Sequence, residues 1–301
     1  MLGNFNHLID ADLELQYETH SRGKKVLNFF LVPTLNIIPR SASNLLKRTH
    51  SAAREVIEHA TTHKALENLY SRGSAHPHRN FVQRLFHAIW FSTGNSKAVR
   101  NRLRLVTREI GLALRDRLKN VEDIEDQKIC ILSIASGSAR AVMAALIQEK
   151  VGATAPIKLV FVDKSSHALA YSRQLYADLG LSLPAEWIET TAGSFLRTHI
   201  ADGSLFDIVE MVGLLDYFDA PKASNLIRDI YNVMRIGGTF ITANIVANEE
   251  VPFVTKAVGW EMIYRHPHEL EHLFAETGFQ PEKVKLYCEP LGIHCVAVAK
   301  K

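Results

Sequence analysis

The sequence predicts a doubly wound α/β fold, and two features of its 301 residues carry this prediction. From about residue 126 onward, short continuous apolar runs alternate with longer amphipathic segments. Before that point, apolar residues recur at the spacing of helices. Continuous apolar strands that alternate with helices are typical of a parallel sheet covered on both faces, and right-handed crossovers make it doubly wound.

The strands and helices can be assigned in order along the chain. A further strand is expected just before Gly193, where no strongly apolar run stands. We predict a Rossmann-like, seven-stranded, mostly parallel sheet with an antiparallel C-terminal strand, preceded by a helical N-terminal region. The apolar runs are 129–134, 157–162, 206–212, 238–245, 283–287 and 295–299, and the helical segments between them are 140–150, 167–180, 222–234 and 267–277.

The chain divides near residue 94 in this interpretation. Residues 1–94 form the helical region, and residues 95–301 form the sheet domain. From Asn95 to Leu118, apolar residues at every third or fourth position draw one stripe along a helix. We expect residues 1–94 to be a lid over a substrate or a dimerisation surface, and the second alternative leaves a homodimer open.

Composition limits the classes of protein. Apolar residues make up 47% and charged residues 22%, as in a globular protein with a sizeable core. The scattered Cys130, Cys288 and Cys295 are expected to be reduced thiols, which favours a cytoplasmic location. No signal peptide is visible, and the apolar stretch 26–38 is too short to span a bilayer.

Charge is unevenly distributed along the chain. The net charge is +3, with a basic excess in residues 1–125 and an acidic excess in the remainder. A basic N-terminal part could contact RNA, an acidic lipid surface or an anionic substrate, or it could be a solvated face.

A loop of small residues follows the first predicted strand, from Ser133 to Ala139, with Gly137 as its one glycine. Small side chains let the backbone approach a ligand closely, and the amides that open the next helix can bind an anionic group. The missing GxGxxG pattern argues against NAD and FAD. The alternative is a tight strand–helix turn whose small residues serve packing.

Asp163 ends the second predicted strand. A carboxylate at this point can accept hydrogen bonds from two ribose hydroxyls. The alternative is a helix N-cap, because Asp-Lys-Ser-Ser precedes a helical segment.

Together these features resemble the class I S-adenosylmethionine-dependent methyltransferase superfamily over about residues 95–301. ILSIASGSA is similar to motif I, with Ser133 where an acid is commoner and Ala135 and Ala139 where glycines are commoner. VFVDKS, FDIVEMVGLLDYF and RIGGTF resemble the motifs of strands two, four and five. The resemblance implies S-adenosyl-L-methionine as cofactor and S-adenosyl-L-homocysteine as product. The cofactor-binding residues it implies are Ser133, Ala135, Ser136, Gly137, Ser138, Asp163, Lys164, Ser194, Phe195, Gly213, Leu214 and Arg102.

Several segments are similar to a narrower bacterial group, the methyltransferases related to enzymes that make 3-hydroxy fatty acid methyl ester signals. The similar segments are AVRNRL at 98–103, GLLDYF at 213–218, the region of Asn244, and WEMIYR at 260–265. That group also carries a glycine- and tyrosine-rich segment upstream, which residues 1–94 lack. This departure argues against a fatty-acid substrate but leaves the cofactor assignment in place.

Four residues are candidates for catalysis. Asp216 and Tyr217 follow strand four and would lie near the transferred methyl group, with Asp216 as a candidate base. Arg265 is the preferred anchor for an anionic substrate, because guanidinium pairs bidentately with carboxylate. His266 is a second candidate base, and no metal site is expected. The structural alternatives are a backbone-amide partner for Asp216, a surface position for Arg265 and an ordinary loop for His266.

The predicted function is methyl transfer to oxygen or nitrogen of a small molecule, such as a lipid-like or carboxylate-bearing metabolite. One alternative is an RNA methyltransferase that uses the basic helix 100–119 to contact phosphates. It is disfavoured because no Asn-Pro-Pro-Tyr type motif follows strand four and no RNA-binding domain is attached. The other alternative is a non-catalytic binding module that keeps the fold.

Overall fold

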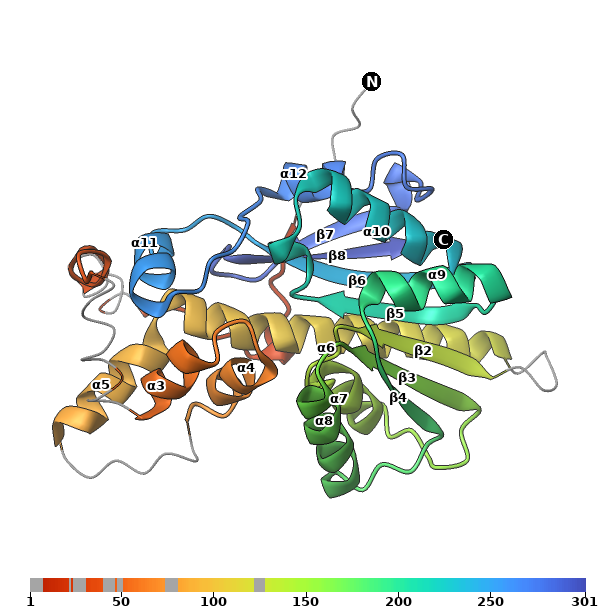
Figure 1. Ribbon diagram of the computed structural model, residues 1–301, viewed down its shortest axis with the longest axis horizontal. Coiled ribbons are helices and arrows are strands. Elements are labelled where there is room, and N and C mark those ends of the chain that lie inside the picture. Colours follow the sequence, from red (N-terminus) through yellow and green to blue (C-terminus); the bar gives the residue numbers. More distant parts are fainter. Residues whose placement is uncertain are drawn as a thin grey trace.

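The computed structural model describes residues 8–21, 23, 31–39, 47, 51–73, 81–121 and 128–301. Within these residues, eight strands form one sheet in the order β1-β7-β8-β6-β5-β2-β3-β4 (Figure 1). Neighbouring strands are parallel except at β8, which is antiparallel to both β6 and β7. The strands are β1 (Leu8–Ile9), β2 (Ile129–Ile134), β3 (Ile157–Asp163), β4 (Ala185–Glu189), β5 (Phe206–Val212), β6 (Met234–Ile245), β7 (Val284–Cys288) and β8 (His294–Lys300).

The predicted doubly wound fold is confirmed, and β1 adds an eighth strand to the seven expected. β1 has two residues that are more than half exposed, so no apolar run marks it in the sequence. The start of β6 was predicted wrongly, because the strand begins at Met234 and contains Gly237 and Gly238. The pairing of β5 with β6 shifts register here, and a Cβ on Gly238 would lie 2.8 Å from the carbonyl oxygen of Arg235.

Helices cover both faces of the sheet (Figure 1). One apolar core lies between the sheet and α6 (Gly94–Val121), α7 (Arg140–Gln148) and α8 (Ser166–Asp178). The other core lies between the sheet and α9 (Ala192–Asp202), α10 (Ala220–Asn232) and α12 (Pro267–His272). The predicted apolar stripe of α6 faces the first core through Val106, Ile110 and Leu114, which are buried.

The N-terminal helices pack beyond the carboxyl ends of the parallel strands. The helices α3 (Ser51–Glu58), α4 (His63–Tyr70) and α5 (Phe81–Ser92) share an apolar cluster with α11 (Val251–Phe253) and the π-helical turn η4 (Val254–Val258). They therefore border the edge of the sheet where doubly wound folds bind ligands. Of the apolar stretch 26–38, residues 26–30 lie outside the described residues.

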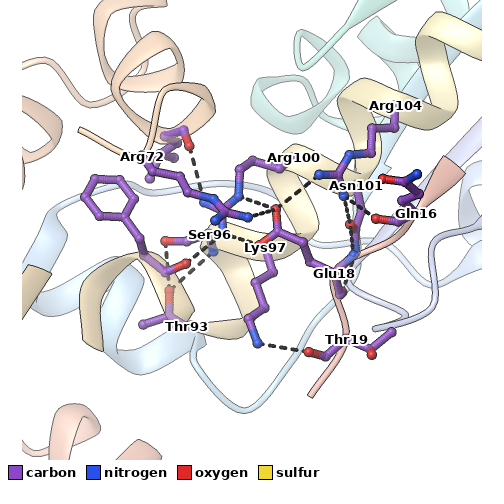
Figure 2. A network of polar contacts seen from close by, with 12 residues as sticks. Gln16, Glu18, Thr19, Arg72, Thr93, Ser96, Lys97, Arg100, Asn101 and Arg104 are labelled. Atoms are coloured by element: carbon purple, nitrogen blue, oxygen red, sulfur yellow. Dashed lines mark hydrogen bonds and ion pairs between the residues drawn. The ribbon is translucent and has the colours of Figure 1, made fainter. Parts of the chain in front are cut away.

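Residues 8–20, here called the N-terminal strap, begin as strand β1 at the edge of the sheet and then run along α6. The Glu18 carboxylate lies 2.7 Å from Arg100 Nε and 3.0 Å from an Arg72 nitrogen (Figure 2). Further along, Arg108 pairs with Asp10 and Asp12. Burial acts to raise the pKa of Glu18, but hydrogen bonds and charge from Arg100 and Arg72 outweigh it and lower the pKa to about 2. The strap thus neutralises much of the basic face of α6.

The expectation of three reduced cysteines is wrong for two of them. Cys288 and Cys295 stand opposite each other in β7 and β8 and form a disulfide, whereas Cys130 is free. The pairing register of the two strands brings the sulfur atoms together, and spacing in the sequence does not reveal this. The expected cytoplasmic location loses the support of the reduced cysteines, since disulfides persist mainly in oxidising compartments. Among the described residues, no helix is long and apolar enough to cross a membrane.

Candidate functional site

A cavity of about 1030 Å³ opens where the carboxyl ends of the central strands meet the N-terminal helices. Its walls come from the loops after β2, β3, β4 and β5, from α4 and α6, and from the segment after β6. Ligand pockets usually measure about 300–1,000 Å³, so this volume can hold a cofactor and a second small molecule together.

The loop after β2 forms one end of the cavity. Ala135, Gly137 and Ala139 all adopt left-handed backbone conformations, with φ of 50°, 53° and 53°. The Ser136 amide donates to the Val162 carbonyl at 2.9 Å, which ties the loop to β3. This shape turns the chain sharply into α7, whose N-terminus carries no side-chain cap. The first amides of α7 are therefore left without a capping side chain.

Not all the small residues of this loop reach the cavity. Ala135 and Gly137 line it, whereas Ser133 is completely buried in the sheet, and Ser136 and Ser138 are not among the lining residues. Among the described residues, no group bonds the buried Ser136 hydroxyl. A Cβ on Gly137 would lie 3.5 Å from the Cβ of His63, so α4 covers the loop directly.

Asp163 clamps the loop from the end of β3. One carboxylate oxygen accepts the Gly137 amide at 2.9 Å, and the other accepts the Ser165 amide at 2.9 Å. The N-cap of α8 is Ser165, which accepts the Ala168 amide, so Asp163 does not hold the capping position. Asp163 and the exposed Lys164 both line the cavity.

Ser133 donates a hydrogen bond to Glu210, its neighbour in the pairing of β2 with β5. Burial raises the pKa of Glu210 to about 7, against the lowering effects of the Ser133 hydrogen bond and the Arg102 charge. Arg102 is itself buried on α6, lines the cavity, and lies 3.8 Å from where a Cβ on Gly213 would stand. The structure thus brings Ser133, Arg102 and Gly213 together as a group.

The turn after β5 supplies the next part of the wall, and Gly213, Leu214, Asp216 and Tyr217 all line the cavity. The buried Asp216 accepts a hydrogen bond from the backbone amide of Ile245 at 3.0 Å. This is the backbone-amide partner that was the structural alternative for Asp216. Burial raises its pKa and the positive charge of Arg102 opposes the shift. The Tyr217 hydroxyl accepts a hydrogen bond from Trp260 Nε1 at 2.7 Å, and burial raises its pKa to about 12.

Two predicted catalytic residues lie away from the cavity wall. Arg265 is buried, and its guanidinium donates to the Leu215 carbonyl at 2.8 Å, to Asn244 Oδ1 at 2.6 Å and to the Phe218 carbonyl. These bonds hold the turn after β5 and use three of the five N–H donors of the guanidinium. His266 is exposed at the N-cap of α12, and neither residue lines the cavity. Arg265 therefore supports the turn after β5, in place of the predicted role as a substrate anchor.

Two predicted cofactor residues are also displaced. Ser194 and Phe195 belong to α9, and the cavity is lined by the residues just before them, Thr190–Gly193. Phe195 is buried in the core and stacks on His199. The shift arises because β4 is half-exposed and ends at Glu189, which leaves the sequence without a strong apolar run to locate its end.

Several residues of the site were missed. His63 lies over the Gly137 loop, and Glu250 accepts the Gly94 and Asn95 amides at 2.6 and 2.9 Å. His294 lines the cavity from the first position of β8. Each is far in the sequence from the motif it joins, so no local pattern marks it. Among the described residues, no cluster of three metal-ligating side chains occurs.

The sequence matches no protein-family model and no curated protein. A solved structure from Bordetella parapertussis, described as a possible exported protein, matches 94% of this chain and 99% of its own, with 13% identity and a TM-score of 0.62. The magnesium protoporphyrin IX methyltransferase of Synechocystis with bound SAM matches 83% of this chain and 97% of its own, with 10% identity and a TM-score of 0.49. An O-methyltransferase family protein from Burkholderia thailandensis matches 73% and 62%, with 13% identity and a TM-score of 0.46. At 13% identity, the Bordetella structure shows a shared fold alone.

Proposed function

We propose that this protein transfers a methyl group from S-adenosylmethionine to a small-molecule acceptor. The observation that carries the proposal is the left-handed loop Ala135–Ala139, which Asp163 clamps at the edge of a large cavity. The resemblance of this loop and of the segments after β3 and β5 to methyltransferase motifs supports the same conclusion.

The residues present fit such a cofactor. The N-terminus of α7, which its N-cap residue Ala139 does not cap with a side chain, suits an anionic group such as the methionine carboxylate. Asp163 accepts one amide on each oxygen, and an ionised carboxylate has about four acceptor positions, so two remain for ribose hydroxyls. Thr190–Gly193 would border the adenine, and Gly213 and Leu214 the sulfonium.

When bound, this cofactor supplies an electrophilic methyl group. The task of the protein is then to align the acceptor and exclude water. Val99, Phe253, Val254 and Val258 line the cavity and belong to the apolar cluster under the N-terminal helices. A largely apolar acceptor would displace water from this wall.

The placement of the α6 arginines disfavours the RNA alternative. Arg100 is buried and bonded to Glu18, and Arg108 pairs with Asp10 and Asp12. Arg115 pairs with Glu149. Since phosphate binding needs cations that are free to contact the backbone, we propose a small molecule as the acceptor and no nucleic-acid partner.

Calorimetric titration tests the cofactor assignment. Wild-type protein is expected to bind S-adenosylmethionine and S-adenosylhomocysteine. Asp163→Ala is expected to weaken both by about 10- to 100-fold, because hydrogen bonds to a charged group are lost. Asp178→Ala, at an exposed position of α8, is the matched control and should bind like wild type.

Asp163→Asn tests ribose binding separately from loop folding. The side-chain oxygen of asparagine can still accept the hydrogen bond from the backbone amide of Gly137. Circular dichroism and thermal unfolding check that both Asp163 variants fold. No binding by wild type, or unchanged binding by a folded Asp163→Ala, contradicts the proposed site. Cofactor binding without methyl transfer to a panel of acids, phenols and amines would support the non-catalytic module.

A further inference from the structure

His294 is a buried histidine at the wall of the cavity. It opens β8 opposite Ile245, the last residue of β6, and only 2% of it is exposed. Among the described residues, neither ring nitrogen has a hydrogen-bond partner. Buried polar groups are nearly always paired, so two unpaired nitrogens on a residue that lines a cavity point to a ligand.

Arg102 stands beside this histidine. It is also buried at the cavity wall, and among the described residues its Nε has no partner. Burial lowers the pKa of His294 well below its usual range, and the positive charge of Arg102 adds to the effect. The ring is therefore neutral near pH 7, with one nitrogen that donates and one that accepts.

The chemistry of a neutral imidazole beside a guanidinium selects the ligand. An ammonium group only donates and would face the charge of Arg102. A carboxylate only accepts, and would leave the accepting nitrogen of His294 unpaired. A hydroxyl can donate to that nitrogen, and its oxygen can at the same time accept from Arg102 Nε.

We propose that His294 binds a hydroxyl group of an apolar acceptor and takes its proton, while Arg102 donates a hydrogen bond to the same oxygen. This inference rests on the proposed methyl transfer and assigns the acceptor to hydroxylated apolar compounds, methylated on oxygen. His294 would touch the reacting group directly.

The step balances in atoms and charge. The hydroxyl oxygen forms a bond to the methyl carbon, and the carbon–sulfur bond breaks with its electron pair remaining on sulfur. The hydroxyl proton moves to the accepting nitrogen of His294. One positive charge is lost from sulfur and one appears on the imidazole, so the net charge of the site is unchanged.

Two buried acidic residues hold the backbone around His294 in place. Glu289, fully buried in the turn between β7 and β8, accepts the backbone amides of Ile293 and His294 at 2.8 and 3.3 Å. Asp216 holds the amide of Ile245, the residue paired with His294. Arg102 opposes the charged form, which keeps the ring ready to accept a proton at rest.

The first experiment needs no methyl donor. Nitrogen-15 NMR of the histidine rings is recorded with 1-naphthol, and with naphthalene as the probe that lacks the hydroxyl. The ring signals of His294, assigned by their absence in His294→Gln, are expected to shift with 1-naphthol only. Calorimetry is expected to show about tenfold weaker binding of 1-naphthol to His294→Gln, as one or two hydrogen bonds are lost.

The second experiment measures methyl transfer from radiolabelled S-adenosylmethionine to 1-naphthol, 1-naphthoic acid and 1-naphthylmethylamine, which carries an ammonium group near pH 7. Only the hydroxyl compound is expected to be methylated. His294→Gln should lose about 100-fold or more in turnover, as general bases usually contribute this much, with cofactor affinity unchanged. His272→Gln, at an exposed position at the end of α12, is the control and should behave as wild type.

The outcomes separate the two proposals. Failure to bind S-adenosylmethionine overturns the proposed function. Cofactor binding with methylation of the acid or amine in preference to 1-naphthol overturns the role of His294. Three other results also overturn the role of His294. They are an unshifted His294 signal, undiminished turnover in folded His294→Gln, and cofactor binding with no methylation of 1-naphthol.

Discussion

Ser133 and Glu210 form a buried hydrogen-bonded pair across the adjacent strands β2 and β5. The loop motif commonly begins with an acid, and this chain has Ser133 there. The carboxylate stands instead at Glu210, on the neighbouring strand β5, and accepts the Ser133 hydroxyl. A carboxylate is therefore present at this level of the sheet, although it comes from another segment of the chain.

This buried carboxyl makes stability depend on pH. Burial raises the pKa of Glu210 from 4.5 to about 7, so between these values the folded protein holds a proton that the unfolded chain has released. The contribution of Glu210 to the free energy of unfolding is therefore greatest below about pH 4.5. It falls by on the order of 3 kcal/mol as the pH rises to about 7. Urea unfolding at pH 5 and pH 8 should show this loss in wild type and not in Glu210→Gln.

Glu282→Gln, at an exposed position, is the control for that measurement and should keep the wild-type pH dependence. An equal fall in stability of wild type and Glu210→Gln would show that Glu210 is ionised in the folded protein throughout this range.

At the scale of elements, α6 is held by the N-terminal strap as well as by its apolar face. Arg100 donates to Glu18 and also to the carbonyls of Leu69 and Phe91 (Figure 2). One buried guanidinium therefore joins the strap, the end of α4 and the end of α5. Because α4 covers the Gly137 loop, this junction helps to fix the roof of the cavity.

Glu18→Ala is expected to destabilise the protein by about 3 kcal/mol, because removal of one partner leaves Arg100 buried and uncompensated. The matched control is Glu14→Ala in the same strap, where the carboxylate is exposed. Chemical unfolding measures the difference, and limited proteolysis shows whether cleavage begins within residues 8–20. Equal stability of the two variants would contradict a structural role for the pair. The contribution of Glu18 should also fade as the pH falls from 4.5 towards 2.

At the scale of the whole molecule, the cavity belongs to two regions of the chain. The sheet supplies the loops, and the N-terminal helices supply the cover. His63 packs over Gly137, and Glu67 pairs with Arg140, the first residue of α7. Tyr171 on α8 donates to the same Glu67 at 3.0 Å. Cofactor binding should therefore stabilise α4 as well as the sheet.

Hydrogen exchange measured with and without S-adenosylhomocysteine tests this coupling. Exchange is expected to slow in α4 as well as in residues 133–139, since the ligand would stabilise the packing of one on the other. The amides of α12, which packs in the other apolar core of the sheet, serve as the internal reference. Protection confined to residues 128–301 would show that the N-terminal helices do not close on the cofactor.

Much of the fold could be predicted because its signals are local. A buried parallel strand such as β3 is a continuous apolar run, and the stripe of α6 follows the helical period. The loop at Gly137 and the acid at Asp163 stand next to such strands, so their place at the carboxyl edge followed from the order of elements. Two-residue β1 and half-exposed β4 carry weaker patterns. The sequence therefore did not predict β1, and the uncertain end of β4 displaced the prediction at Ser194 and Phe195.

The sequence by itself therefore determined the sheet, the loop and the acid that define the proposed cofactor site, because each depends on residues close together in the chain. The tertiary structure alone decided which polar side chains face the cavity. It engaged Arg265 with backbone carbonyls and joined Cys288 to Cys295. Within the described part of the chain, it left Arg102 Nε and both ring nitrogens of His294 without a partner at the cavity wall. These outcomes depend on strand register and burial, which bring together residues that no local pattern connects.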